Sequence, residues 1–136
     1  MDTRGQQLLL DLWLSSSLRE EEVKKVIDFG RSNFHVVAES AHSFDPHGLT
    51  QVLILAESHF SVHTYPEHRY MSIDLYICDL SIDLVDVRDR ILKLVPTKTY
   101  RSQIIERGIN PDLIASSASI VPHLENSQAQ RISHDD

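Results

Sequence analysis

The chain has 136 residues, a formal net charge of −7 and a single cysteine. This length corresponds to one domain with a modest core, a size at which pairing of chains often adds stability. The negative charge and the absence of a Lys/Arg cluster argue against nucleic acid and anionic membranes as partners, and the lone cysteine excludes an internal disulfide. No apolar run could cross a bilayer or act as a signal peptide, so we expect a cytoplasmic protein.

The first half of the chain predicts a strand, a helix and three further strands. Residues 7–14 form a mainly apolar run, which indicates a buried strand. Apolar residues then recur at helical spacing over about residues 18–32, and the sequence from Ser17 to Glu20 fits a capping box. Strands are expected near residues 35–42, 50–57 and 60–65, with Asp45-Pro46-His47-Gly48 as a turn between the first two.

The second half predicts a strand, a helix and a last strand. These are a strand at residues 70–78, a helix with the apolar stripe Leu84, Val87, Ile91, Leu94 and Val95 that ends at Pro96, and a strand at residues 97–107. The order β-α-β-β-β-β-α-β indicates an α+β two-layer sandwich, with two helices on one face of a largely antiparallel sheet. We expect this domain to span residues 1–115 and the polar residues 116–136 to form a mobile tail.

Period-two alternation makes the second face of the sheet polar. In the strand at residues 70–78 it places Tyr70, Ser72, Asp74, Tyr76 and Cys78 on one side and the aliphatic residues on the other. In the preceding strand Ser61, His63 and Tyr65 share a side. Such a face suits an active site, a partner subunit, or both.

The segment between Ala56 and His68 concentrates a serine, a threonine, carboxylates and three imidazoles on two expected strands. Together with the segments around it, this part of the chain resembles the small prokaryotic S-adenosylmethionine decarboxylases, which depend on a pyruvoyl group. The motifs that carry the resemblance are Gly48-Leu49-Thr50, Ala56-Glu57-Ser58-His59, His63-Thr64-Tyr65-Pro66-Glu67 and Ile73-Asp74-Leu75-Tyr76-Ile77-Cys78. The match runs from about Gly5 to Gly108.

The resemblance implies self-cleavage between Glu57 and Ser58, into a β chain of residues 1–57 and an α chain of residues 58–136. A serine hydroxyl can attack the preceding carbonyl, and a base can then eliminate the resulting ester, which converts the serine to a pyruvoyl group. The family pattern makes Ser58 the pyruvoyl precursor, Thr50 the processing hydroxyl and His63 the processing base. Thr50 stands where the family has a serine.

The resemblance also implies how substrate is bound and decarboxylated. The pyruvoyl carbonyl forms a Schiff base with the substrate amine and accepts electrons as carbon dioxide leaves. Cys78 matches the family's proton donor, Phe44 and Tyr65 match the rings that stack on adenine, and Glu67 matches the carboxylate that binds ribose. No metal is expected.

Two departures from the family pattern keep a second substrate class open. Asp79 follows Cys78 where the family has glycine, and Gln7 stands where a histidine is common. A carboxylate beside the proton donor would suit a basic amino acid, so the alternative is a pyruvoyl-dependent ornithine or arginine decarboxylase. If S-adenosylmethionine is the substrate, the Asp79 side chain should turn to solvent or meet a basic residue.

Three further expectations concern the remaining histidines, the class of protein and the assembly. His59 is predicted to point away from the face of His63, and neither His59 nor His68 is placed in the catalytic set. A non-catalytic regulatory homologue is the lesser alternative, although Ser58, His63 and Cys78 are all present. Because so short a chain cannot enclose a nucleoside alone, we expect a homodimer whose two sites each use residues of both subunits.

Overall fold

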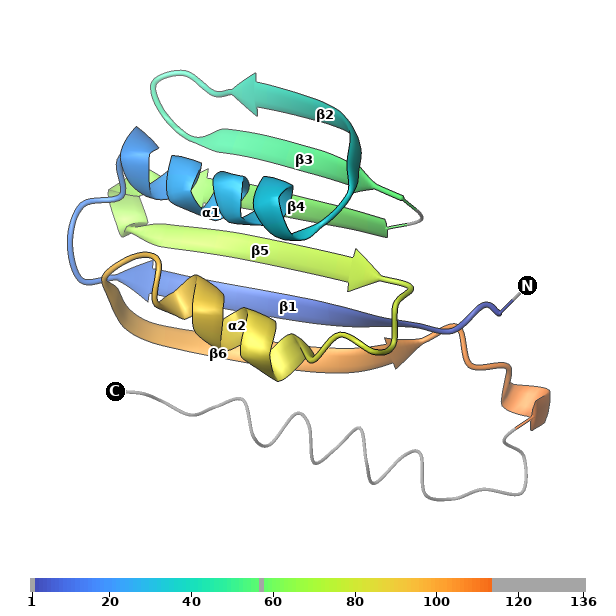
Figure 1. Ribbon diagram of the computed structural model, residues 1–136. Helices are drawn as coiled ribbons and strands as arrows, with labels where there is room; N and C mark the ends of the chain where they lie inside the picture. The colour runs from blue at the N-terminus through green and yellow to red at the C-terminus, as the bar shows by residue number, and fades with distance from the viewer. Residues whose placement is uncertain (1, 57, 114–136) are drawn as a thin grey trace.

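The computed structural model describes residues 2–56 and 58–113 as a six-stranded sheet with two helices (Figure 1). The elements in chain order are β1 (Gly5–Leu14), α1 (Glu20–Asn33), β2 (Val36–Ser43), β3 (Leu49–Leu55), β4 (Ser58–Tyr65), η1 (Pro66–His68), β5 (Tyr70–Ile77), α2 (Leu84–Leu92), β6 (Thr97–Arg107) and η2 (Pro111–Leu113). This is the predicted order, with two short 3₁₀ turns added.

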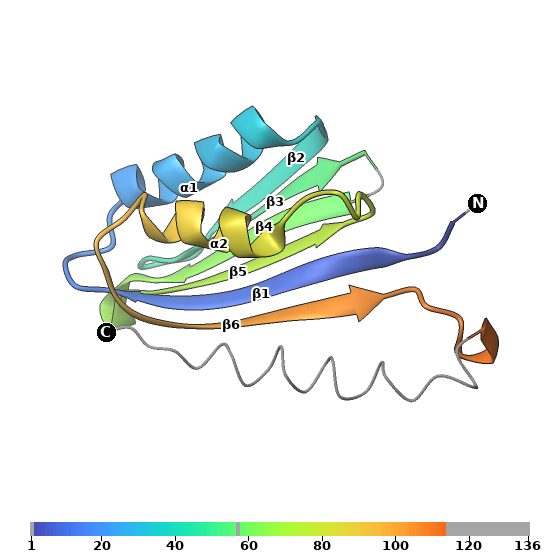
Figure 2. The ribbon, with the colours of Figure 1, turned by 60° about the horizontal axis from the view of Figure 1, so that its bottom comes forward.

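Every neighbouring pair of strands is antiparallel, and the order across the sheet is β2-β3-β4-β5-β1-β6. Both α-helices cover the same face of the sheet, and the opposite face carries no helix of the described residues (Figure 2). We call the latter the open face. The predicted α+β two-layer architecture is therefore confirmed, and the predicted tail at residues 116–136 lies outside the described residues.

Strands from the two sides of residue 57 are interleaved in this order. The part of the chain before it supplies β2, β3 and β1, whereas the part after it supplies β4, β5 and β6. Consequently β1 lies between β5 and β6, with its two neighbours both drawn from the second part of the chain. The sheet is thus built from strands of both parts of the chain.

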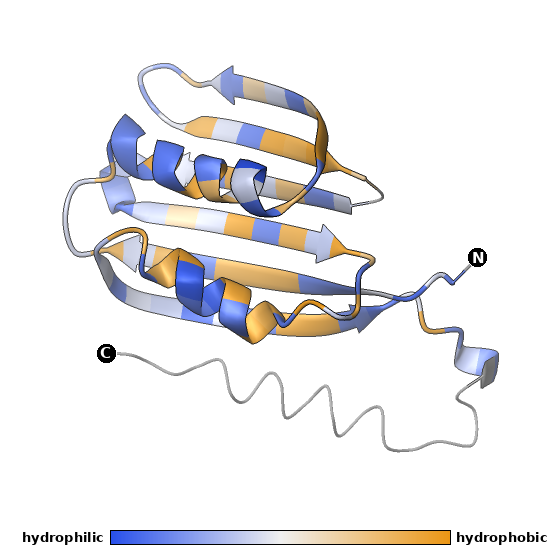
Figure 3. Cartoon of the chain, viewed as in Figure 1, coloured by the Kyte–Doolittle hydropathy of each residue, from blue (hydrophilic) through white to orange (hydrophobic). Residues whose placement is uncertain are grey.

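Alternation along the strands builds the core between the sheet and the helices. In β5 the helix-facing residues Met71, Ile73, Leu75 and Ile77 are buried, and the residues between them are half-buried. Figure 3 shows the same alternation as bands of apolar and polar residues along the strands. The helix-covered face therefore holds the hydrophobic core, and the polar side chains are left for the open face.

Helix α1 packs very closely on the sheet at Gly30. A Cβ atom at this position would lie 2.7 Å from Cδ2 of Phe60 and 2.8 Å from Cδ1 of Leu53, both of which are fully buried. Glycine is therefore required by the approach of the helix to β3 and β4.

Helix α2 ends at Leu92 and does not continue to Pro96 as predicted, because the next residues form a tighter turn in which the Leu94 N–H donates to the Ile91 carbonyl at 3.0 Å. Two further predicted boundaries shift for identifiable reasons. Helix α1 begins at Glu20, and its capping interaction is a hydrogen bond from the Arg19 backbone N–H to Glu22 Oε1 at 2.8 Å, so the capping box predicted from Ser17 is wrong. Strand β4 begins at Ser58 instead of Phe60, because Leu55 of β3 pairs directly with Ser58. The two strands adjoining the expected cleavage site are therefore joined by only two residues.

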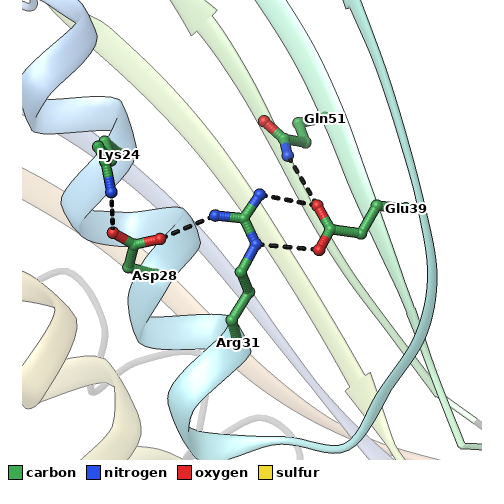
Figure 4. Close-up of polar contacts among 5 residues, drawn as sticks. All are labelled: Lys24, Asp28, Arg31, Glu39 and Gln51. Carbon is green, nitrogen blue, oxygen red and sulfur yellow. Dashed lines mark hydrogen bonds and ion pairs between the residues drawn. The ribbon is translucent and has the colours of Figure 1, made fainter.

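An ionic chain ties α1 to the exposed edge strand β2 (Figure 4). Asp28 accepts from Lys24 Nζ at 2.6 Å and from Arg31 Nη1 at 2.8 Å. The Arg31 guanidinium also makes two bonds to Glu39 of β2, at 2.8 and 2.9 Å, and Gln51 of β3 donates to the same carboxylate at 3.3 Å. The bidentate pair fixes the hairpin of β2 and β3, whose loop carries Phe44.

Candidate active site

The expected cleavage and proton-donor residues lie together at one end of the sheet. The backbone N–H of Cys78 donates to Ser58 Oγ at 3.3 Å. Ser58 begins β4, and Cys78 directly follows the neighbouring strand β5. We call this region, residues 55–58 and 77–79, the hairpin end. Glu57 lies outside the described residues.

A hollow of about 350 Å³ opens beside Ser58 and Cys78. Its lining includes Leu55, Ile77 and Ile82, which makes it largely apolar, and Cys78 is an exposed residue. Leu55 and Ile77 belong to the helix-covered face, so the hollow that Cys78 lines adjoins that face. Strand alternation had instead placed Cys78 on the open face. That prediction extended the period-two pattern beyond Ile77, where the strand ends.

The predicted processing residues form a second group on the open face. Thr50 of β3 and His63 of β4 are cross-strand partners, and Thr50 Oγ1 lies 2.9 Å from His63 Nδ1. The hydroxyl group can donate to or accept from the imidazole, depending on the tautomer. This contact fixes the orientation of the imidazole ring that was predicted to act as a base.

The two groups do not meet within one chain. Ser58 and His63 are five residues apart on the same strand, which corresponds to about 17 Å along β4. Odd spacing also puts their side chains on opposite faces of the sheet. A proton cannot pass directly between them, because transfer requires contact at hydrogen-bond distance.

His59 was predicted to point away from the face of His63, and this prediction is wrong. The prediction assumed a turn between the two histidines, whereas β4 runs without a break through both. Residues four apart on one strand share a face. On that face His59 Nε2 lies 3.7 Å from Asp74 Oδ1, which also accepts a hydrogen bond from Gln7 Nε2 at 2.7 Å.

The three predicted substrate contacts cluster at the opposite end of the sheet, which we call the loop end, residues 43–50 and 63–70. Phe44 is 51% exposed and packs edge-to-face on His42, with ring centroids 4.6 Å apart. Tyr65 is 45% exposed at the end of β4. Two aromatic rings thus remain accessible at one end of the molecule, as a site that stacks on a planar base requires.

Glu67 lies in η1 beside Tyr65 and contacts the loop between β2 and β3. Its Oε1 lies 3.1 Å from Nε2 of His47. A hydrogen bond from its own backbone N–H holds the pKa of Glu67 below the ordinary value, with His47 and His68 adding to the effect. The group therefore carries its negative charge at neutral pH, as a carboxylate that binds hydroxyl groups needs.

Asp79 lines the hollow at the hairpin end, but its carboxylate is occupied by its own loop. Oδ1 accepts from the Ser81 backbone N–H at 2.9 Å and from Ser81 Oγ at 2.6 Å. These bonds lower the pKa of Asp79, which is exposed to solvent. Its exposure fits the expectation for S-adenosylmethionine as substrate, whereas its place in the lining of the hollow beside Cys78 fits the basic amino-acid alternative.

Sequence reasoning missed two groups that adjoin the predicted residues. One is His47, which had been assigned only to a turn, and the other is the pair Trp13 and Tyr70, which stack beside Tyr65. Alternation already put Tyr70 on the open face, and Trp13 is the single tryptophan of the chain. Their cross-strand register, which brings them together, could not be read from the sequence.

The chain is similar in sequence to known decarboxylases. The family model described as "S-adenosylmethionine decarboxylase" matches residues 8–108. The S-adenosylmethionine decarboxylase proenzyme of Sulfurihydrogenibium sp. is 34% identical over 114 residues, covering 80% of this chain and 86% of the relative. The corresponding proenzyme of Geobacillus kaustophilus is 32% identical over 116 residues, covering 82% and 93% of the two chains.

The same relationship holds for the fold. The crystal structure of the adenosylmethionine decarboxylase from Aquifex aeolicus superposes with a TM-score of 0.67 at 30% identity, covering 81% of this chain and 95% of that chain. Sequence and structure thus agree over nearly the whole described domain. The chain belongs to the S-adenosylmethionine decarboxylase family.

Proposed function

We propose that the protein is a self-processing, pyruvoyl-dependent decarboxylase that acts on S-adenosylmethionine in polyamine (spermidine) biosynthesis. One observation carries the proposal: the backbone N–H of Cys78, the expected proton donor, donates to Oγ of Ser58, the expected pyruvoyl precursor, at 3.3 Å at a strand end. They are 20 residues apart in sequence, so the contact depends on the register of β4 and β5. Relatives named decarboxylase proenzymes support the same assignment.

The surroundings of Ser58 fit formation of a pyruvoyl group. The Ser58 hydroxyl attacks the carbonyl of Glu57, which exchanges the peptide bond for an ester. Removal of the Ser58 α-proton by His63 then expels the main-chain carboxylate of Glu57, which separates the two chains and leaves a dehydroalanine at position 58. Its imine tautomer is hydrolysed by water to the pyruvoyl carbonyl, and the former Ser58 nitrogen leaves as ammonia. Thr50, hydrogen-bonded to His63, orients the imidazole for this step and can donate to the oxyanion.

The distance between the two residue groups supports a homodimer. The hairpin end supplies Ser58 and Cys78, and the loop end supplies Thr50 and His63. A twofold axis that lies between two stacked open faces, perpendicular to the strands, places the hairpin end of one subunit against the loop end of its partner. Each site then takes Ser58 and Cys78 from one chain and Thr50 and His63 from its partner. It lies at the rim of the stacked sheets, because Ser58 begins β4 and its side chain is on the face opposite to that of His63.

The loop end supplies the contacts proposed for the nucleoside. Phe44 and Tyr65 stack on the adenine, and the rings also favour the positive sulfonium through their π faces. Glu67 accepts hydrogen bonds from the ribose hydroxyls. The ornithine or arginine alternative is not favoured, because the similar proteins are named S-adenosylmethionine decarboxylases and Oδ1 of Asp79 is already bonded to Ser81.

Decarboxylation divides between the cofactor and the residues around it. When formed, the pyruvoyl group accepts the electrons released as the substrate loses carbon dioxide. Cys78 returns a proton to the substrate α-carbon, and the apolar wall formed by Leu55, Ile77 and Ile82 limits the access of water to this position.

The proposed setting is the cytoplasm, with a small-molecule substrate as the ligand. No helix within residues 2–56 and 58–113 is long and apolar enough to cross a membrane. The low pI of about 5.5 suits a cationic substrate.

Two measurements on the purified protein test the proposal. A denaturing gel should show two fragments divided between Glu57 and Ser58, and Ser58→Ala should remain one uncut chain. Carbon dioxide release should occur with S-adenosylmethionine and be absent with ornithine and with arginine. Normal cleavage in Ser58→Ala would exclude the pyruvoyl assignment. A cleaved protein that decarboxylates only ornithine or arginine would overturn the substrate, and an uncut, inactive chain would favour the regulatory homologue.

A further inference from the structure

Three aromatic rings form a continuous stack across the open face at the loop end. Trp13 of β1 stacks on Tyr70 of β5, with ring centroids 4.9 Å apart and planes inclined by 24°. Tyr70 in turn stacks on Tyr65 of β4 at 5.3 Å and 23°. The three residues are direct cross-strand partners in neighbouring strands. We call Trp13, Tyr70 and Tyr65 the aromatic column.

The middle ring of the aromatic column is fixed by a hydrogen bond. The Tyr70 hydroxyl donates to Asp11 Oδ1 at 2.7 Å, and both residues are half-buried. Burial raises the pKa of Tyr70 to about 12, with the bond to Asp11 adding to the effect, so the phenol stays protonated and able to donate at neutral pH. Tyr70 is therefore held at both its ring and its hydroxyl, and it presents a fixed surface to Tyr65.

On the side away from Tyr70, the strand position next to Tyr65 carries no side chain. The ladder between β3 and β4 ends with Leu49 opposite Thr64, so the residue that continues this register opposite Tyr65 is Gly48. Gly48 has no side chain, and a Cβ atom built there would lie 3.9 Å from Phe44 Cβ. The same Cβ atom would lie 3.3 Å from the Thr64 carbonyl oxygen, so the backbone at Gly48 runs between the loop that carries Phe44 and the end of β4, where Tyr65 stands.

We propose that Tyr70, held by Asp11 and backed by Trp13, is a positioning residue that sets the ring plane of Tyr65 for stacking on the adenine of the substrate. This inference rests on the proposed function, in which Tyr65 stacks on that base. An exposed tyrosine at the end of a strand loses side-chain entropy when a ligand fixes its ring. Stacking on Tyr70 fixes the Tyr65 ring before the ligand binds. The entropy cost of binding is therefore smaller, and the affinity for the nucleoside is higher.

The proposal predicts effects on binding rather than on the chemical step. A contact that helps substrate and transition state equally lowers KM and leaves kcat unchanged. Tyr70→Leu removes the middle ring, so the KM for S-adenosylmethionine and the Kd for adenosine should rise about three- to tenfold, the range that one aromatic pair supports. Tyr70→Phe keeps the ring and removes only the bond to Asp11, so it should give a smaller rise in the same direction. In both variants kcat should stay within about twofold of the wild type.

The single tryptophan supplies an independent signature. Trp13 is connected to Tyr65 through Tyr70, so adenosine binding should alter the Trp13 emission of the wild type. In Tyr70→Leu the change should be lost even at saturating adenosine, because the link between the rings is gone. Tyr100→Leu is the matched control, since Tyr100 of β6 pairs with Leu12 and packs against the core on the helix-covered face, whereas the aromatic column lies on the open face. It should leave KM and Kd within about twofold of the wild type.

The results separate this proposal from the proposed function. Absence of carbon dioxide release from S-adenosylmethionine by the wild type defeats the proposed function, and adenosine calorimetry then still decides the role of the aromatic column. An unchanged Kd for adenosine in Tyr70→Leu, or a loss confined to kcat, overturns the positioning role. If Tyr70→Leu does not fold, the same result in Tyr70→Phe overturns it.

Discussion

The proposal that each site is divided between two subunits can be tested by mixing two inactive variants. Ser58→Ala lacks the cleavage hydroxyl and His63→Ala lacks the base, so each homodimer should stay uncut. Along β4 these two residues are about 17 Å apart, far beyond the reach of proton transfer. In a mixed dimer, one site receives Ser58 from one chain and His63 from the other, and the second site receives neither.

The expected yield follows from random pairing. About half of the dimers are mixed and each holds one intact site, so about one quarter of all sites should work. The two variants are co-expressed with different affinity tags, and the pooled dimers are assayed for cleavage of the His63→Ala chain and for carbon dioxide release. Roughly half of the His63→Ala chains should be cut, all of them in mixed dimers.

The control for this experiment combines two variants of the same residue group. Ser58 and Cys78 contact each other within one chain, so Ser58→Ala mixed with Cys78→Ala should restore no decarboxylation. Equal recovery of decarboxylation in both mixtures would mean that dimer formation only stabilises each chain and that the site is not shared between subunits. No recovery in the Ser58→Ala and His63→Ala mixture, with both proteins folded and dimeric, would refute the divided site.

Three further predictions concern single residues. Cys78→Ala should still self-cleave but lose turnover by orders of magnitude, measured as carbon dioxide release; full activity would assign the proton donor elsewhere. Gly30→Ala should destabilise the fold by about 1–2 kcal/mol, because overpacking against Phe60 outweighs the gain in helix propensity, and an unchanged thermal midpoint would contradict this. The raised pKa of Tyr70, about 12 against 10.0, stabilises the neutral phenol in the folded state. That contribution is complete below pH 10 and is lost as pH rises towards 12, which tyrosinate absorbance can follow; simultaneous titration of all tyrosines near pH 10 would refute it.

Local patterns predicted the architecture because each acts over a few residues. Strand alternation separated the core from the open face, and the helical stripes identified both helices. The boundaries depended on contacts that no local pattern shows. Helix α1 starts where Glu22 reaches the Arg19 backbone, and β4 starts at Ser58 because Leu55 lies opposite.

The candidate site could be predicted as a set of residues but not as an arrangement. The family motif named Ser58, His63 and Cys78 together, yet only the cross-strand register shows that Ser58 meets Cys78 and that His63 meets Thr50 instead. Likewise, the error about His59 came from assuming a turn inside a continuous strand. Pairing between distant strands is non-local, so it requires the folded structure.

The interleaved sheet has a consequence for the life of the processed protein. Cleavage at residue 57 would leave β1 inserted between β5 and β6 of the other fragment, and β3 still paired with β4. The two fragments could then separate only if three strand pairs, β1–β5, β1–β6 and β3–β4, lost their hydrogen bonds together. Before cleavage, unfolding and refolding involve one chain. After cleavage, unfolding also dissociates the two fragments, and refolding requires both fragments to associate again at their cellular concentration. The uncut precursor would be the only form that folds as a single chain.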